Sequence, residues 1–287
     1  MLSKNIETFI GCDSEYSESD IVLFGAPFDG TTSFRPGTRF GPPEIRHQSY
    51  GLETYSPYQD ADLCDFRIFD SGDLELCFGD TVRVLDDIKS RTKQILEDGK
   101  LPFMVGGEHL VMLGAVRAVF DKYPQLAIVH FDAHADLRDD YLGQKLSHAC
   151  VLRRCHELVG DGSIYQFGIR SGDRSEFIWQ QQGHTEMYRY DTAELQQVLS
   201  RLQNRPVYLT VDLDVLDPSV FPGTGTPEAG GIGFDTLRKD VTMICQQLQV
   251  VGCDVNELSP AYDPSGVSTA VAGKIIREML IALANRV

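Results

Sequence analysis

The chain has 287 residues, of which 42% are hydrophobic and 24% are charged, and its 26 basic and 42 acidic residues give a formal net charge of −16. This composition is typical of a globular protein and excludes collagen-like, disordered and membrane-spanning classes. The acidic excess also opposes binding to nucleic acid and to anionic membranes, because that binding depends on Lys and Arg. The acidity is compatible with a cationic partner or substrate, although solubility alone is the more ordinary explanation of it. The length suits one large domain over residues 1–287.

Short apolar segments rich in β-branched residues predict eight strands: Ile21–Gly25, Arg67–Asp70, Pro102–Gly106, Ala127–Asp132, Ile164–Ile169, Glu186–Tyr190, Val207–Asp212 and Val250–Val255. Helical patterns alternate with them at Asp80–Glu97, Leu110–Lys122, His148–Leu158, Ala193–Leu202, Asp235–Gln247 and Ser268–Leu283. Several strand segments are almost continuously apolar, as in strands that are covered on both faces. The alternation predicts an α/β domain with a mainly parallel sheet.

The seven cysteines are odd in number, scattered and never arranged as Cys-x-x-Cys. This pattern favours a set of reduced thiols over a disulfide framework or a zinc knuckle. The N-terminal segment has no apolar core of the kind found in signal peptides, and no stretch approaches the roughly 18 apolar residues of a membrane span. We therefore expect a soluble, cytoplasmic protein.

Acidic and histidine side chains cluster where predicted strands end. Asp132, His134 and Asp136 follow the fourth strand at alternate positions, which point to one side of an extended chain. Asp212 and Asp214 end the seventh strand in the same way. Four carboxylates at neighbouring strand ends repel one another unless cations neutralise them, so the pattern predicts two divalent metals.

His109 follows Gly106-Gly107 at the end of the third strand, where the glycines permit a sharp turn. Each segment has an ordinary alternative: a histidine in this position often caps a helix, and an aspartate at a strand end often closes a turn. The three segments together favour a functional site, because α/β sheets bind ligands at the carboxyl ends of their strands.

Four segments carry a family resemblance: Gly106–His109, Phe131–Asp136, Val211–Pro218 and Asp254–Pro260. They resemble the ureohydrolase family of arginases and agmatinases, and the similarity extends from Gly25-Ala-Pro-Phe-Asp-Gly30 to the last helix. The resemblance implies a three-layer α/β/α domain around an eight-stranded sheet. It also implies a binuclear manganese site, with two Mn²⁺ ions per chain.

Carried over position by position, the resemblance assigns His109 and Asp136 to the first metal and His134 and Asp214 to the second, with Asp132 and Asp212 bridging both. Such an oxygen-rich set without a thiolate suits Mn²⁺ and argues against a cysteine-type zinc site. The identity of the metal rests mainly on the resemblance, because Zn²⁺ or Co²⁺ would bind the same groups more tightly.

The implied reaction is hydrolysis of a guanidinium group by a metal-bridging hydroxide, since two metals lower the pKa of a shared water. Asp136 would also orient the hydroxide and carry its proton to the leaving amine. Glu257 matches the carboxylate that pairs with the guanidinium, and His148 matches a histidine that relays protons or orients the substrate. Asp254 either supports the metal site or is purely structural.

The segment Leu137–His148 departs from the Asn-, Ser- and Thr-rich loop with which arginases recognise an amino acid, and it resembles the bacterial agmatinase loop. The expected reaction is therefore agmatine to putrescine and urea, a step of polyamine biosynthesis. Arg138 leaves open a carboxylate-bearing guanidine such as 4-guanidinobutyrate or formiminoglutamate, unless it pairs with Asp139 or Asp140.

Two further alternatives are an arginase and, less expected, a single-metal deacetylase of similar layered fold. Family members are commonly trimers or pairs of trimers, so a homo-oligomer is expected.

Overall fold

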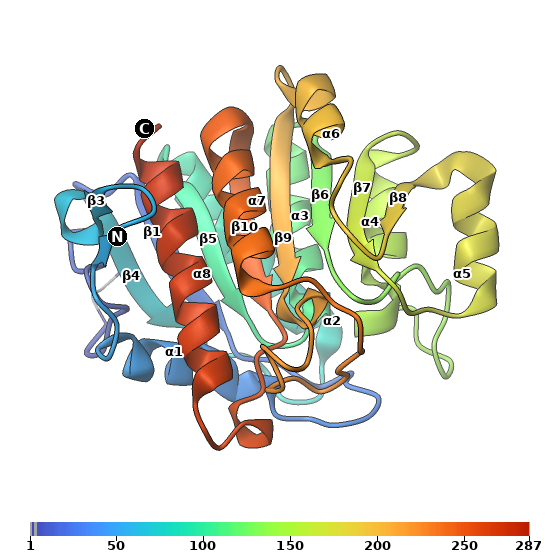
Figure 1. The fold of residues 1–287 in the computed structure, drawn as a ribbon, viewed down its shortest axis with the longest axis horizontal. Coiled ribbons are helices and arrows are strands. Elements are labelled where there is room, and N and C mark those ends of the chain that lie inside the picture. The colour runs from blue at the N-terminus through green and yellow to red at the C-terminus, as the bar shows by residue number, and fades with distance from the viewer. Residues whose placement is uncertain (1, 3–4, 287) are drawn as a thin grey trace.

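The computed structural model describes residues 2 and 5–286, and its centre is one eight-stranded sheet (Figure 1). The strand order is β4-β1-β5-β10-β9-β6-β7-β8, and every neighbouring pair is parallel. The strands are β1 (Ile21–Ala26), β4 (Ile68–Asp73), β5 (Leu101–Gly106), β6 (Ala127–Phe131), β7 (Ile164–Ile169), β8 (Glu186–Arg189), β9 (Pro206–Asp212) and β10 (Gln249–Asn256). The predicted α/β class and the eight parallel strands are confirmed.

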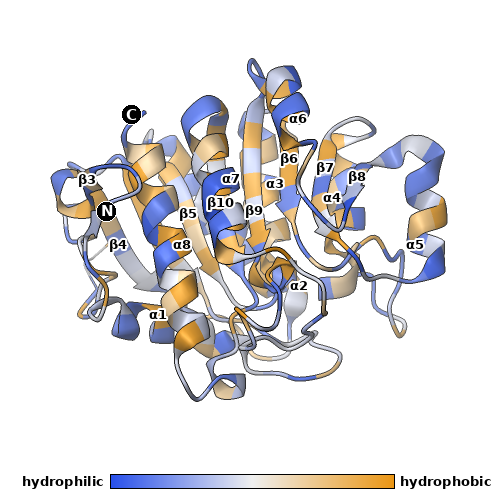
Figure 2. Ribbon diagram, in the orientation of Figure 1, coloured by the Kyte–Doolittle hydropathy of each residue, from blue (hydrophilic) through white to orange (hydrophobic). Residues whose placement is uncertain are grey.

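Helices cover both faces of the sheet, which makes the three layers α/β/α. One face carries α2 (Thr81–Glu97), α3 (Met112–Lys122) and α4 (Val151–Val159), and the other carries α1 (Gly41–Ser49), α6 (Leu195–Leu202), α7 (Phe234–Gln247) and α8 (Val267–Ala284). Successive residues of β1 enter opposite cores: Ile21 and Leu23 face α8, whereas Val22 and Phe24 face α2 and α3. Figure 2 shows polar residues on the outer sides of α6 and α7.

The four central strands run in the spatial order β5-β10-β9-β6, although β9 and β10 come last in the chain. All four point the same way, so their carboxyl ends meet along one edge of the sheet. The loops that follow them gather at that edge, at the bottom of Figure 1. This is the position where open parallel sheets bind ligands.

Three elements were not predicted from the sequence: α1, α5 (Arg174–Trp179) and the antiparallel pair β2 (Tyr55–Ser56) and β3 (Ala61–Asp62). The start of α1 is Gly41-Pro42-Pro43, a composition that does not by itself indicate a helix. Proline is tolerated there because the first turn of a helix needs no N–H donors. The helix α5 has only six residues, although Asp173 and Glu176 form a capping box at its start.

Two predicted helices begin later than expected, because each opens with a 3-10 turn. His109–Val111 precedes α3, and His148–Cys150 precedes α4. All seven cysteines are free thiols. Among the described residues, no helix is long and apolar enough to cross a membrane.

Candidate metal centre

The structure brings the six predicted metal ligands together at the carboxyl ends of β5, β9 and β6. His109 lies in the 3-10 turn after β5, and Asp212 is the last residue of β9. Asp214 lies in the next turn, and Asp132, His134 and Asp136 follow β6. Five of the six are buried, with exposed fractions of 6% or less, and the His134 side chain is 23% exposed.

The prediction that these side chains converge because they alternate along extended chain is only partly right. The strand β6 ends at Phe131, so Asp132–Asp136 is not extended chain, and Asp136 has a left-handed φ of 53°. The turns are instead held by the carboxylates themselves. Asp132 accepts a hydrogen bond from the N–H of His134 (2.6 Å), and Asp212 accepts one from the N–H of Asp214 (2.9 Å). The ordinary role of aspartate in closing a turn thus coexists with a place in the site.

Asp132 lies between two histidine–carboxylate groups. Its Oδ2 is 3.1 Å from Nδ1 of His109, which is also 3.1 Å from Oδ2 of Asp136. Its Oδ1 is 3.5 Å from Nδ1 of His134, which is 3.0 Å from Oδ2 of Asp214. The two oxygens of one carboxylate therefore face two different groups, as a bridging ligand requires.

A relay of hydrogen bonds fixes the ring of His109. Thr210 donates its hydroxyl proton to Asp254 (2.6 Å), so its oxygen accepts from Nε2–H of His109 (2.9 Å). Nδ1 is therefore the ring nitrogen that faces Asp132 and Asp136, and it is the atom that would bind a metal placed between them. Asp254 thus supports the site, and it also accepts from the Tyr208 hydroxyl (2.5 Å).

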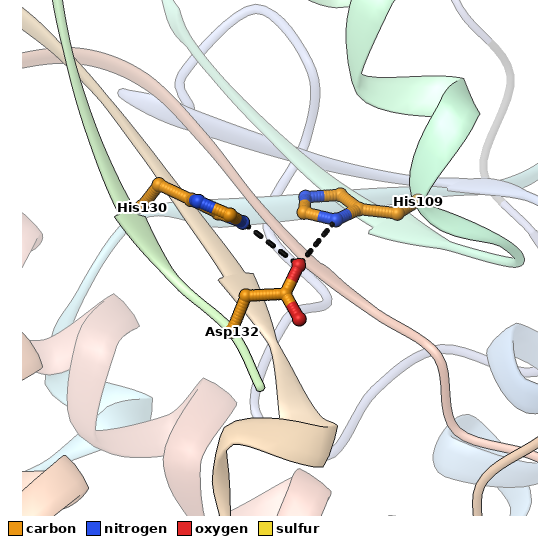
Figure 3. Close-up of side chains that lie close together, drawn as sticks. All are labelled: His109, His130 and Asp132. Atoms are coloured by element: carbon orange, nitrogen blue, oxygen red, sulfur yellow. Dashed lines mark hydrogen bonds and ion pairs between the residues drawn. The ribbon is translucent and has the colours of Figure 1, made fainter. Parts of the chain in front are cut away.

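His130 was not predicted as a site residue, and its ring points at the same oxygen of Asp132 that the ring of His109 faces (Figure 3). Its Nε2 is 2.8 Å from Oδ2 of Asp132, and its Nδ1 is 3.2 Å from the side-chain nitrogen of Gln166. Thr185 donates to the Gln166 oxygen (3.0 Å), which orients that amide with its N–H toward His130. Nδ1 therefore accepts and Nε2–H donates to Asp132, so His130 orients the carboxylate and has no free lone pair for a metal.

Negative charge is concentrated in this buried region. Burial, followed by repulsion from Asp132, raises the pKa of Asp136 to about 7. Burial, followed by repulsion from Asp214 and Asp132, raises the pKa of Asp212 well above its usual value. Every ion pair that the described residues make with the four aspartates is to a histidine. Carboxylates gathered in this way need additional cations. A set of four carboxylates and two imidazoles suits divalent metals.

A cavity of about 220 Å³ opens beside the six residues and is also lined by Glu257, His148 and Arg138. Glu257 follows β10 with a left-handed φ of 69°, and its Oε1 accepts from the backbone N–H of His109 (2.8 Å). Strained backbone at Asp136 and Glu257 is typical of functional sites. Asp136, His148 and Glu257, the three residues predicted from the sequence to transfer protons or bind substrate, thus face one cavity.

The loop around Thr31 connects His148 to the segment after β5. Thr31 donates its hydroxyl to Glu108 and accepts from the backbone N–H of His148 (3.1 Å). His148 Nε2 lies 3.1 Å from the Ser33 hydroxyl. Burial, together with the nearby His134 and His109, lowers the pKa of His148 to about 4, so its ring is neutral near pH 7.

The sequence left open a pairing of Arg138 with Asp139 or Asp140, and the structure shows neither pair. The Arg138 guanidinium contacts Glu176 (Nε–Oε2, 3.6 Å) and lies over the Tyr141 ring, 4.7 Å from its centroid. Asp139 pairs instead with Arg154 (2.7 Å). A cation and a carboxylate therefore stand together at the cavity.

Comparison with known proteins decides the family. A family model described as "Arginase family" matches residues 19–282. The chain belongs to the arginase family. It is 48% identical to an agmatinase of Bacillus subtilis over 96% of each chain, and 33% identical to a guanidinobutyrase of Pseudomonas aeruginosa over 94% of this chain and 88% of that protein. A solved structure from Clostridium difficile superimposes with a TM-score of 0.93 and 48% identity, covering 95% of this chain and 99% of that one.

For this arginase-family chain, the sequence prediction missed the residues that hold the ligands in place. His130 lies on β6 two positions before the predicted ligand Asp132, and Thr210 lies on β9 two positions before the predicted ligand Asp212. Extending the period-two pattern by two residues toward the N-terminus would have identified His130 and Thr210. Glu108 carried no such signal, because its partner Thr31 is 77 residues away in the chain.

Proposed function

We propose that the chain is one catalytic domain that hydrolyses agmatine to putrescine and urea with two Mn²⁺ ions, in the cytoplasm. The observation that carries this proposal is the sharing of Asp132 between two histidine–carboxylate groups beside a cavity that also contains Glu257 and His148. His109 and Asp136 would hold the first ion, His134 and Asp214 the second, and Asp132 and Asp212 both. The ions would lower the pKa of a water so that hydroxide is available near neutral pH.

Glu257 binds the guanidinium group of the substrate. One of its oxygens already accepts from the N–H of His109, which orients the carboxylate toward the cavity. The second oxygen and the remaining lone pairs can accept the N–H groups of a planar cation. Burial and the neighbouring Asp214 and Glu108 raise the pKa of Glu257, and a bound guanidinium would favour its charged form.

Asp136 and His148 move the proton that the reaction releases. Asp136 faces both the metal ligands and the cavity, so it can receive a proton from the attacking water and deliver it to the leaving amine. His148 is neutral and can accept a proton on the side of the cavity where Ser33 lies. Protonation of the departing nitrogen releases putrescine, and urea remains.

Agmatine is favoured over other guanidines by charge and by similarity. It is a dication, and the chain carries a net charge of −16. A relative that is 48% identical over nearly its whole length is named an agmatinase. Arg138 supports one second candidate, hydrolysis of 4-guanidinobutyrate, because a guanidinium at the cavity can bind a carboxylate. The contact between Arg138 and Glu176 disfavours this candidate, since Glu176 already neutralises the charge of Arg138.

The test is a comparison of kcat/KM for agmatine, arginine, 4-guanidinobutyrate and formiminoglutamate, using enzyme stripped of metal and reloaded with Mn²⁺. We expect the highest value for agmatine, and loss of urea release on chelation. An active metal-free enzyme would refute the proposal, and a preference for guanidinobutyrate would select the second candidate. A count of one metal per chain would instead favour single-metal chemistry of the deacetylase type.

The family resemblance further supports a homo-oligomer, either a trimer or a hexamer. Sedimentation equilibrium of the loaded enzyme tests this, and a monomer at micromolar concentration would contradict it.

A further inference from the structure

A second cluster of metal-binding side chains lies away from the candidate metal centre. His156 is in the last turn of α4, Asp161 is in the loop between α4 and β7, and His184 ends the short helical turn Gln180–His184 before β8. Nε2 of His156 is 2.7 Å from Oδ1 of Asp161, and Nδ1 of His184 is 2.9 Å from the same oxygen. One ligand atom from each residue lies within 4.8 Å of the others.

This cluster is at the opposite edge of the sheet from the metal centre. Asp161 and His184 come just before the first residues of β7 and β8, whereas the metal centre follows the last residues of β5, β6 and β9. The cluster is also open to solvent: the side chains of His156, His184 and Asp161 are 17%, 29% and 64% exposed. An ion could therefore enter without passing the catalytic cavity.

We propose that His156, Asp161 and His184 form a third metal site, for a late first-row divalent ion such as Zn²⁺. Two imidazoles and one carboxylate, with a fourth position left to water, are a common zinc ligand set. Ligand atoms of a tetrahedral zinc site lie about 3.3 Å apart, so the present 2.7 and 2.9 Å separations need to widen by only a few tenths of an ångström.

The ligand set also separates this site from the catalytic one. It has two imidazoles to one carboxylate, whereas the metal centre has four carboxylates to two imidazoles. Nitrogen-rich sites favour zinc and copper, and Mn²⁺ is the weakest binder of the first-row divalent series. The third site therefore stays free of Mn²⁺ at concentrations that fill the catalytic centre and takes up Zn²⁺ or Cu²⁺ instead.

The chain carries its own reporter for this site, because Trp179 is its only tryptophan. The Trp179 ring stacks on His184 with centroids 4.4 Å apart and meets His156 edge-on at 4.8 Å. The guanidinium of Arg153 lies 3.9 Å from the centroid of the same ring, so this cation is held on the tryptophan and not on the ligands. A paramagnetic ion such as Cu²⁺ bound to the three residues would quench Trp179 fluorescence at short range.

Metal binding would add a link between three segments that otherwise meet through hydrogen bonds to Asp161 and ring contacts with Trp179. The segment that ends in His184 contains Gly183 with a left-handed φ of 96°, and it leads into β8, which is the edge strand of the sheet. A bound ion would link this segment to α4 and so stabilise the edge. Any ligand that binds only the folded state raises the midpoint of thermal unfolding.

The experiment titrates the Mn²⁺-loaded enzyme with Cu²⁺ and follows Trp179 fluorescence, with Zn²⁺ as the silent competitor. The variants are Asp161→Asn and His156→Gln. The matched control is His47→Gln, which removes an exposed histidine that pairs with one carboxylate, Glu7, at 3.0 Å. We expect saturable quenching by one equivalent of Cu²⁺, reversal by Zn²⁺, and an affinity weakened at least about tenfold in both variants, with no change in His47→Gln.

A second measurement is thermal unfolding with and without Zn²⁺. The wild type and His47→Gln should gain more in midpoint than Asp161→Asn, which keeps only the part that comes from exchange of Zn²⁺ for Mn²⁺ at the catalytic centre. Urea release, measured before Zn²⁺ is added, should be equal in all of them. Quenching or thermal stabilisation that is the same in Asp161→Asn and in the wild type would overturn the proposal. The absence of stoichiometric quenching in the wild type would also overturn the proposal, whether or not the enzyme hydrolyses agmatine.

Discussion

The carboxylate of Glu257 and the backbone N–H of His109 are joined by a 2.8 Å hydrogen bond, although the two residues are 148 positions apart in the chain. The bond connects a group proposed to bind substrate to a group proposed to bind metal. The contact is reinforced by a second one, in which the N–H of Glu257 donates to the carbonyl of Gly107 (2.9 Å). The turn that carries His109 is therefore positioned by the end of β10.

This contact makes the choice of substitution at Glu257 important. Glu257→Gln keeps an oxygen that accepts from His109 but removes the negative charge, so we expect two bound metals, a raised KM and a kcat lowered by about two orders of magnitude or more. Glu257→Ala also removes the support of His109 and should weaken metal binding. Steady-state kinetics and metal counting separate the two variants, with Asp132→Ala as the reference for loss of both metal and activity. Loss of metal in Glu257→Gln would contradict the assigned role.

The second prediction concerns His130. Substitution by phenylalanine keeps a ring behind Asp132 but removes the N–H that orients its carboxylate. Supporting contacts of this kind typically change metal affinity by about 10–100-fold. We expect His130→Phe to need more Mn²⁺ for half-maximal activity, with a smaller loss of kcat at saturating Mn²⁺. An unchanged activation curve would show that Asp132 does not depend on His130.

A third prediction concerns stability at low pH. The pKa of His148 is about 4 in the folded protein, against an ordinary value of 6.5. The unfolded chain therefore binds more protons between these values, and the folded state loses stability as the pH falls from 6.5 toward 4. His148→Gln lacks this titrating imidazole and should lose less stability over the same pH range. Denaturant unfolding of the two metal-free proteins from pH 4 to 8 checks this, and parallel stability curves would refute it.

The fourth prediction concerns an ion pair that holds α1 against the sheet. Arg46 is 3% exposed, its Nε lies 2.7 Å from the fully buried Asp70 within β4, and it also pairs with Asp73 at the end of that strand. Arg46→Met leaves these carboxylates without their cation and should cost about 3–5 kcal/mol of unfolding free energy. Arg67→Met, which breaks the more exposed pair with Asp20 (2.8 Å), should cost about 1 kcal/mol or less. Equal losses in the two variants would contradict the prediction.

The parts that could be predicted from the sequence are those with a local signal. Apolar runs such as Ala127–Phe131 define the strands, and the ligands follow them within a few residues because a parallel sheet collects its strand ends at one edge. The Asp-x-His-x-Asp spacing predicted that these side chains lie together, and they do, although they converge through turns held by Asp132 and not through extended chain.

What could not be predicted depends on contacts between distant segments. The bonds between Arg46 and Asp70, and between Glu108 and Thr31, have no counterpart in sequence spacing. The helix α1 was hidden by the prolines at its start, and the two-residue strands β2 and β3 are too short to show alternation. The cluster of His156, Asp161 and His184 was missed because His184 is 23 residues from its partner Asp161.

The strand order has a consequence for how the protein is made. During synthesis β5 and β6 emerge early, each with one edge unpaired, and the gap between them is filled only by β9 and β10, near the end of the chain. A ribosome-bound chain that stops before residue 206 therefore carries two open edges at its centre, the kind of surface on which nascent chains aggregate. Loading of the proposed metals must also wait, since the proposed ligands Asp212 and Asp214 belong to the segment that arrives last.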